Sequence, residues 1–84
     1  TVVVAGSNVS GYKSGDDVYG MSMILDHGGG AIAEYINVIP QRIAHKPQNL
    51  SFVEAAALPL AGVSAWQALV DIMHIKSGQK ILIH

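Results

Sequence analysis

The last nine residues, KSGQKILIH, place an apolar run directly after a Ser-Gly turn. Residues 80–84 do not alternate apolar and polar side chains, which is the pattern of a parallel strand covered on both faces. Such a strand needs neighbouring strands and covering helices, because its backbone polar groups and both of its faces must be buried. The run therefore predicts an α/β arrangement, and it predicts that further chain is needed to enclose this strand.

A short helix is predicted well before this strand. The stretch LSFVE at residues 50–54 contains S-x-x-E, the pattern of a capping box. In that motif the Ser51 hydroxyl bonds the backbone N–H of Glu54, and the Glu54 carboxylate bonds the backbone N–H of Ser51. The helix is expected to begin near Phe52. It cannot pass the residue before Pro59, because proline disfavours helical geometry in its predecessor.

A second helix is predicted over residues 61–73, ended by the turn at Ser77-Gly78. Its apolar side chains recur at spacings of three and four, which predicts a stripe that faces a core. The members of this stripe are Val63, Trp66, Leu69, Val70 and Met73. We expect Trp66 to be a buried anchor of this helix.

The first half of the chain is predicted to be β-structure, with loops rich in Gly, Asn and Ser between the strands. The expected extended segments are residues 1–5, 17–19, 31–39 and 42–45. Asp16, in a Gly-Asp turn, is expected to brace its loop by hydrogen bonds to the backbone. The order of β segments, two helices and a strand predicts a mixed β and α/β fold class, with a seam near Lys46-Pro47.

Composition excludes several classes of function. The net charge is −1 and no cluster of Lys and Arg is interleaved with aromatic residues, so nucleic acid is not expected as a partner. No apolar run approaches the roughly 20 residues that span a bilayer, so no membrane segment is expected. The absence of cysteine excludes disulfides and thiolate-ligated zinc within this sequence. It also fits the cytoplasmic location that we expect.

Three stretches, in order, resemble the medium-chain dehydrogenase/reductase superfamily, in particular its zinc-independent quinone oxidoreductase branch. GYKSGDDVYG (11–20) is similar to the family's F-K-x-G-D-x-V-x-G turn and strand. GGGAIAEYINVIPQRIAHKP (28–47) is similar to its G-x-x-A-E-Y strand and the following K-P. LSFVEAAALPLAGVSAWQALVDIMHIKSGQKILIH (50–84) is similar to its capped helix, its A-A-x-P-x-x-G-x-T-A-W hinge helix and its x-x-G-x-x-V-L-I-H strand.

The resemblance implies a fold. Residues 1–46 would be the C-terminal part of a GroES-like (alcohol dehydrogenase-like) β domain. Residues 47–84 would be the hinge helices and the first strand of a Rossmann dinucleotide-binding domain. In the family a glycine-rich turn follows this strand, and its backbone N–H groups hold the cofactor pyrophosphate. The sequence stops before the first glycine of that turn, so we expect an internal segment of a longer enzyme.

The resemblance also implies cofactor-binding residues. The family usually has Thr at the position of Ser64, in the first turn of the hinge helix. A hydroxyl there can bond the nicotinamide end of the cofactor, and the free N–H groups of a helix start favour acceptor groups. Ser64 could instead be a helix-terminal serine that satisfies its own backbone. Leu60 and Val63 would line the same crevice, or they could belong to the core.

No metal site is expected. The four histidines show no i, i+4 pairing on one helix and no thiolate partners; they are His27, His45, His74 and His84. In the zinc-dependent branch of the family the position of Leu60 holds a cysteine that ligates the zinc, and leucine cannot ligate a metal. The three glycines at 28–30 lack the G-K-[ST] ending of a phosphate-binding loop, so a hairpin loop is expected there.

For the longer protein, the resemblance implies hydride transfer from NADPH, with NADH possible, to a quinone or another activated carbonyl or alkene. The alternatives are a 2-enoyl-thioester (enoyl) reductase of the same superfamily, including the enoyl reductase module of polyketide synthases, and a non-catalytic scaffold relative. Catalytic residues are expected outside residues 1–84, so none is named. The expected partner is a small-molecule substrate, the longer protein is expected to be a homodimer, and the 84-residue segment alone is expected to be inactive.

Overall fold

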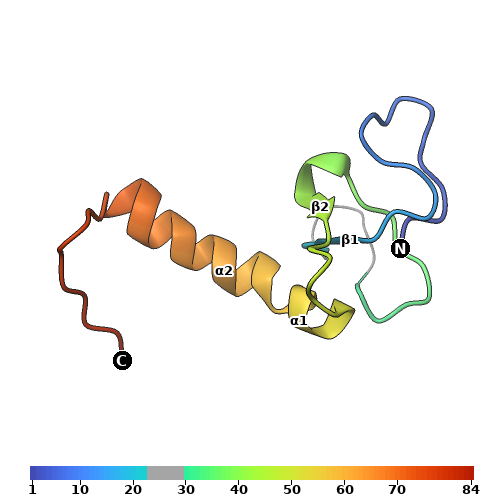
Figure 1. Cartoon of the computed structure of the whole chain (residues 1–84). Helices are drawn as coiled ribbons and strands as arrows, with labels where there is room; N and C mark the ends of the chain where they lie inside the picture. The colour runs from blue at the N-terminus through green and yellow to red at the C-terminus, as the bar shows by residue number, and fades with distance from the viewer. Residues whose placement is uncertain (23–29) are drawn as a thin grey trace.

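The computed structural model describes residues 1–22 and 30–84. Its described elements, in chain order, are strand β1 (Val18–Gly20), the 3-10 helix η1 (Pro40–Arg42), strand β2 (Ile43–His45), helix α1 (Phe52–Ala56), helix α2 (Leu58–Trp66) and the π-helix η2 (Gln67–Ile72). α1 lies beside the two strands, and α2 with η2 extends away from them toward the other end of the molecule (Figure 1). The predicted order of β segments followed by two helices is confirmed.

β1 and β2 form an antiparallel pair in which Tyr19 lies opposite Ala44. The Tyr12 hydroxyl donates to the Ile43 carbonyl at 2.7 Å, which ties the preceding loop to β2. The last residue of β1, Gly20, lies against β2 so closely that a Cβ there would overlap the Arg42 carbonyl oxygen and lie 2.8 Å from Ile43 Cγ2. The extended segments predicted at 17–19 and 42–45 are therefore confirmed, each shifted by about one residue, as expected at element ends.

The strands predicted at residues 1–5 and 31–39 are wrong for this chain. Val2 makes two backbone hydrogen bonds, donating to Asp16 and accepting from Gly15, and neither extends into a ladder. The stretch from 31 to 39 is exposed along its whole length. A strand needs a partner for its alternate N–H and C=O groups, and among the described residues only β1 and β2 form such a ladder. Most of the loop predicted at 21–30 lies outside the described residues.

The two helices follow closely upon one another. Ser51 caps α1 through the predicted capping box, and Ala57 is both the C-cap of α1 and the N-cap of α2. α2 begins at Leu58, three residues earlier than predicted, because Pro59 occupies its first turn. Proline is tolerated there, since the N–H groups of a first helical turn have no intrahelical acceptor. The predicted end at residue 73 is confirmed within one residue, and His74 follows η2 with a left-handed φ of 50°.

The apolar surface of the helical half is not enclosed by the described residues. Of the predicted stripe, Val63, Trp66, Val70 and Met73 are exposed, and Trp66 retains 64% of its side-chain surface. The prediction that Trp66 is buried is therefore wrong for this chain. Residues 80–84 form no strand, and Leu82 is 89% exposed. A buried strand requires partners on both edges and cover on both faces, and the described part of the chain contains neither.

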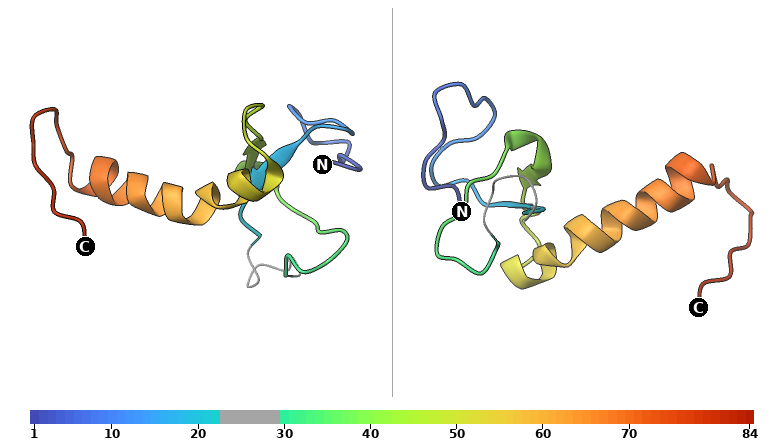
Figure 2. Two further views of the ribbon diagram at one scale, coloured as in Figure 1. Left: turned by 60° about the horizontal axis from the view of Figure 1, so that its bottom comes forward. Right: turned by 180° about the vertical axis from the view of Figure 1, so that it is seen from behind.

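The molecule is elongated as a result. α2 and η2 form one rod that projects away from the β half, and the C-terminal segment continues beyond the end of this rod (Figures 1 and 2). The radius of gyration is 15.6 Å, against the roughly 12 Å of a compact domain of this length. Among the described residues only Ala55, in α1, is a fully buried apolar side chain. Within the described part of the chain, full burial is therefore confined to α1, which contacts β1.

Candidate functional site

α2 carries the three residues predicted to bind cofactor. Leu60, Val63 and Ser64 occupy neighbouring positions on this helix at spacings of three and four, and all three are exposed. Ser64 is the seventh residue of α2, so it lies beyond the first turn. The predicted placement of Ser64 in the first turn of the helix, near free N–H groups or as a terminal serine, is wrong because the helix starts at Leu58. Its predicted contact with the cofactor stays a prediction. Ser64 presents a hydroxyl from the middle of a helix.

A cavity of about 640 Å³ lies where the first turns of α2 meet the β half. Its lining residues are Tyr19, Gly20, Met21, Gln41, Arg42, Ile43, Ala44, Leu58, Pro59, Gly62, Val63 and Trp66. Leu58, Gly62 and Trp66 follow one another at i, i+4 and i+8, which places them on one face of α2. Val63 is the only one of the three predicted site residues that lines this cavity. Leu60 and Ser64 are each two residues from Gly62, and at about 100° per residue they lie on the other side of α2.

The cavity wall is mainly aliphatic and aromatic, with polar groups from Gln41, Arg42 and Tyr19. Such a mixture suits a flat, largely apolar group that carries one or two polar atoms. No His, Asp, Glu or Lys belongs to the lining among the described residues, so general acid–base chemistry has no ordinary donor there apart from the Tyr19 phenol. The catalytic residues remain unassigned in residues 1–84.

Sequence reasoning did not find this cavity. Tyr19, Arg42 and Trp66 approach one another only because β1, the η1–β2 corner and α2 converge, and they are far apart in the sequence. The one available signal was the small residue Gly62 between Leu58 and Trp66. A Cβ at Gly62 would meet only Leu58, at 4.0 Å, so there is room for a methyl group at this point of the cavity wall.

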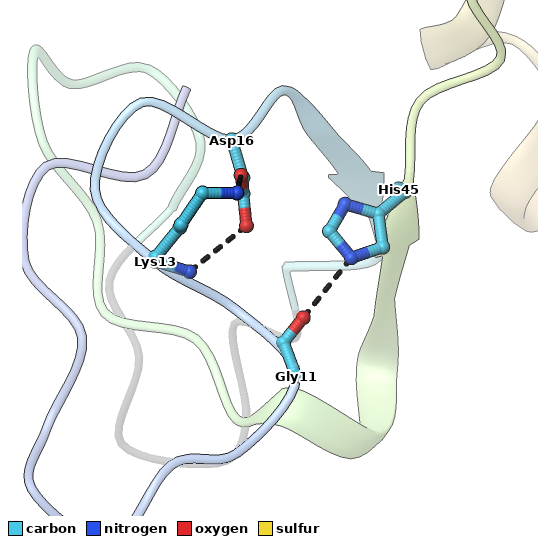
Figure 3. Close-up of polar contacts among 4 residues, drawn as sticks. All are labelled: Gly11, Lys13, Asp16 and His45. Carbon is cyan, nitrogen blue, oxygen red and sulfur yellow. Dashed lines mark hydrogen bonds and ion pairs between the residues drawn. The ribbon is translucent and has the colours of Figure 1, made fainter.

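A set of polar contacts braces the loop before β1 (Figure 3). The Lys13 ammonium lies 2.7 Å from Asp16 Oδ1, and the Lys13 backbone N–H donates to Asp16 Oδ2 at 2.9 Å. The predicted role of Asp16 as a brace of its loop is confirmed. The hydrogen bond from the Lys13 ammonium, and after it the bond from the Lys13 backbone N–H, holds the pKa of the Asp16 carboxyl below its usual value. Asp16 is thereby a structural carboxylate.

His45 holds the same loop against β2. Its Nε2 lies 3.0 Å from the Gly11 carbonyl oxygen (Figure 3), and because a carbonyl can only accept, Nε2 carries the proton. The His45 ring also stacks on Tyr12 with centroids 4.9 Å apart. His45 therefore has a complete structural role, which explains its position without any ligand.

The described residues contain no group of three or more His, Cys, Asp or Glu side chains able to hold a metal ion. His74 Nδ1 lies 3.1 Å from the Val70 carbonyl at the end of η2, and His84 is exposed at the end of the chain. His27 and the predicted loop at Gly28 and Gly29 lie outside the described residues. The expectation of no zinc stays a prediction. No helix in the described part is both long and apolar enough to cross a bilayer.

Comparison with known proteins assigns the chain to a family. No family model and no solved structure matches it. It is 46% identical to a 2-methylene-furan-3-one reductase of Solanum lycopersicum over 98% of this chain and 22% of the relative. It is 41% identical to a chloroplast envelope quinone oxidoreductase homolog of Arabidopsis thaliana over 89% of this chain and 22% of the relative.

A third relative has a different architecture. The chain is 38% identical to a highly reducing polyketide synthase of Penicillium crustosum over 94% of this chain, but only 3% of the relative. These relatives share a reductase segment. The chain belongs to the medium-chain dehydrogenase/reductase superfamily, and within it the relatives are of the quinone and enone reductase kind. The chain spans about a fifth of the length of the two single-function relatives.

Proposed function

We propose that this chain is part of an NADPH-dependent reductase that transfers hydride to a quinone or another activated carbonyl or alkene. The observation that carries the proposal is the 46% identity to a 2-methylene-furan-3-one reductase along almost the whole chain. The cavity between β1 and α2 supports it, because its apolar wall with a few polar groups suits a flat conjugated molecule.

The resemblance assigns Val63 and Ser64 to the nicotinamide end of a cofactor. Val63 lines the cavity, whereas Ser64 lies on the other side of α2, where its exposed hydroxyl can exchange a hydrogen bond with a carboxamide. When bound, the nicotinamide supplies the hydride. The two α-helices begin after Ser51 and Ala57 rather than after a glycine-rich loop, so the pyrophosphate must be held by other residues. Leu60, which cannot ligate a metal, supports a reductase without catalytic zinc.

The domain layout is part of the proposal. Residues 1–46 would close a GroES-like β domain, and residues 47–84 would open a Rossmann domain. In that setting the exposed stripe of α2 and the segment at 80–84 would be covered by the rest of the protein. We further propose a cytoplasmic homodimer; one relative carries a chloroplast-envelope name, so fractionation of cells that express the longer protein tests the location.

The test is an assay of the longer protein. Its reading frame is recovered, and NADPH oxidation is followed by absorbance with a quinone, an enone and an enoyl thioester, then repeated with NADH. We expect turnover with the quinone or the enone, with NADPH preferred. Ser64→Ala should raise the KM for the cofactor, Ser64→Thr should keep it, and Ser77→Ala is the matched control in an exposed turn. Absence of turnover with every acceptor contradicts the proposal and favours the non-catalytic scaffold.

An enoyl-thioester reductase is the second candidate, favoured by the similarity to a polyketide synthase over 94% of this chain. The same assay separates the two. A much larger kcat/KM for the enoyl thioester than for the quinone and the enone would favour this candidate.

The 84-residue chain alone is proposed to be inactive, because neither α1 nor α2 begins after a glycine-rich loop that could hold a pyrophosphate. Titration of the chain into NADPH, followed by nicotinamide fluorescence, should give no saturable change. Saturable binding at micromolar concentrations would contradict this.

A further inference from the structure

The main chain of Lys46 is bound to the β half. Lys46 directly follows β2, and its backbone N–H donates to the Asp17 carbonyl at 2.8 Å. Asp17 directly precedes β1. This bond extends the β1–β2 pairing by one step, so the backbone of Lys46 keeps a fixed position relative to the sheet.

The side chain of Lys46 is bound to the helical half. Its ammonium donates to the Leu50 carbonyl at 2.6 Å and to the Pro47 carbonyl at 3.1 Å. It also lies 5.2 Å from the centroid of the Phe52 ring, within the range of a cation–π contact. Phe52 is the first residue of α1. The Lys46 ammonium, which has three N–H donors, therefore contacts both the connecting turn and the first residue of α1.

We propose that Lys46 is a positioning residue, a clamp that fixes the direction in which the helices leave the sheet. α1 and α2 are separated by Ala57 alone, so the orientation set at Phe52 is passed to α2. The cavity has one wall from β1 and β2 and the other from α2, so the clamp also sets the separation of these walls. The inference stands on the Lys46 contacts and does not depend on the proposed function.

The absence of cysteine from the sequence allows a direct test on the full 84-residue chain. Spin labels are placed at Ser14→Cys in the β half and Gln67→Cys at the start of η2, both exposed positions. Double electron–electron resonance then measures the distribution of distances between them. Lys46→Met, which keeps an unbranched apolar side chain and the backbone bond to Asp17 but loses both side-chain hydrogen bonds, should broaden the distribution. Lys46→Arg, which keeps a charged donor, should restore most of the narrow distribution.

Lys80→Met is the matched control, because Lys80 is exposed in the C-terminal segment, and it should leave the distribution unchanged. An unchanged width in Lys46→Met, equal broadening in Lys80→Met, or a failure of Lys46→Arg to restore the width would each overturn the proposal. A second measurement needs no Lys46 variant. Nuclear Overhauser contacts between the Lys46 Hε protons and the Phe52 ring must be present in the unsubstituted chain, and their absence would also overturn it.

Discussion

At the start of α1, the side chains of Ser51 and Glu54 each accept a hydrogen bond from the other residue's backbone N–H. The Ser51 N–H donates to Glu54 Oε2 at 2.8 Å, and the Glu54 N–H donates to Ser51 Oγ at 3.3 Å. The Ser51 hydroxyl also donates to Glu54 Oε2 at 2.7 Å. A helix of five residues is too short to persist on propensity alone, so these bonds and the burial of Ala55 define where α1 begins.

Loss of the cap should destabilise α1. Ser51→Ala removes the acceptor for the Glu54 N–H, and we expect a loss of about 1 kcal/mol. The change is measured from amide and Cα chemical shifts over residues 52–56. Ser51→Asn retains a capping acceptor and should preserve the shifts. If Ser51→Ala and Ser51→Asn left α1 equally ordered, the cap would not be what fixes this helix.

The same cap makes α1 sensitive to acid. The Ser51 backbone N–H, and after it the Ser51 hydroxyl, hold the pKa of Glu54 below its usual value. Because the pKa is lower in the folded state, the stabilisation is present above the unfolded pKa of Glu54. It is lost as pH falls through the folded pKa. The α1 shifts should therefore move toward coil values in acid.

Glu54→Gln is the control for this titration. A glutamine can still accept from the Ser51 N–H at the third helical position, but it does not ionise. The acid-dependent change in α1 should disappear in Glu54→Gln. A titration of equal size in the variant would assign the effect to another group.

The close approach at Gly20 predicts a strong effect of a single methyl group. Gly20→Ala would push a Cβ into the Arg42 carbonyl and to 2.8 Å from Ile43 Cγ2. We expect destabilisation of the β1–β2 pair by roughly 1–3 kcal/mol, read from faster exchange of the Met21 amide, which donates to the Arg42 carbonyl. Gly30→Ala, where the new Cβ meets nothing within 4 Å, should leave that exchange unchanged.

The single tryptophan reports on the uncovered face of α2. Trp66 retains 64% of its surface, so its fluorescence in the 84-residue chain should be red-shifted and readily quenched by acrylamide. Denaturant should change the emission only slightly. A blue-shifted, quencher-resistant emission at low protein concentration would mean that the stripe on α2 is covered within this chain.

Signals confined to a few residues were read correctly from the sequence. The S-x-x-E pattern located the start of α1, because capping acts between residues that are close in the chain. The role of Asp16 was found for the same reason, since its partner Lys13 is three residues away. Pro59 did not mark the end of α1, since α1 ends at Ala56 and Leu58 is already helical in α2. The start of α2 was missed because Pro59 was read as a boundary, whereas proline is also compatible with a first turn.

Periodicity was less informative than these local signals. The alternation at residues 31–39 and the stripe on α2 describe which faces are apolar, and they do not say what covers them. In this chain the described residues cover neither surface, so residues 31–39 do not form a strand and the stripe is exposed.

The candidate site was also predicted only in part. Resemblance pointed to Leu60, Val63 and Ser64, but only Val63 proved to line the cavity.

The sequence by itself determined the family, the helix cap and the braced turn before β1. These depend on motifs or on neighbours within a few positions. Tertiary structure alone decided that Tyr19, Arg42 and Trp66 surround one cavity and that Lys46 joins the sheet to α1. Those contacts depend on how separate segments meet in space, and local preferences carry no information about such an approach.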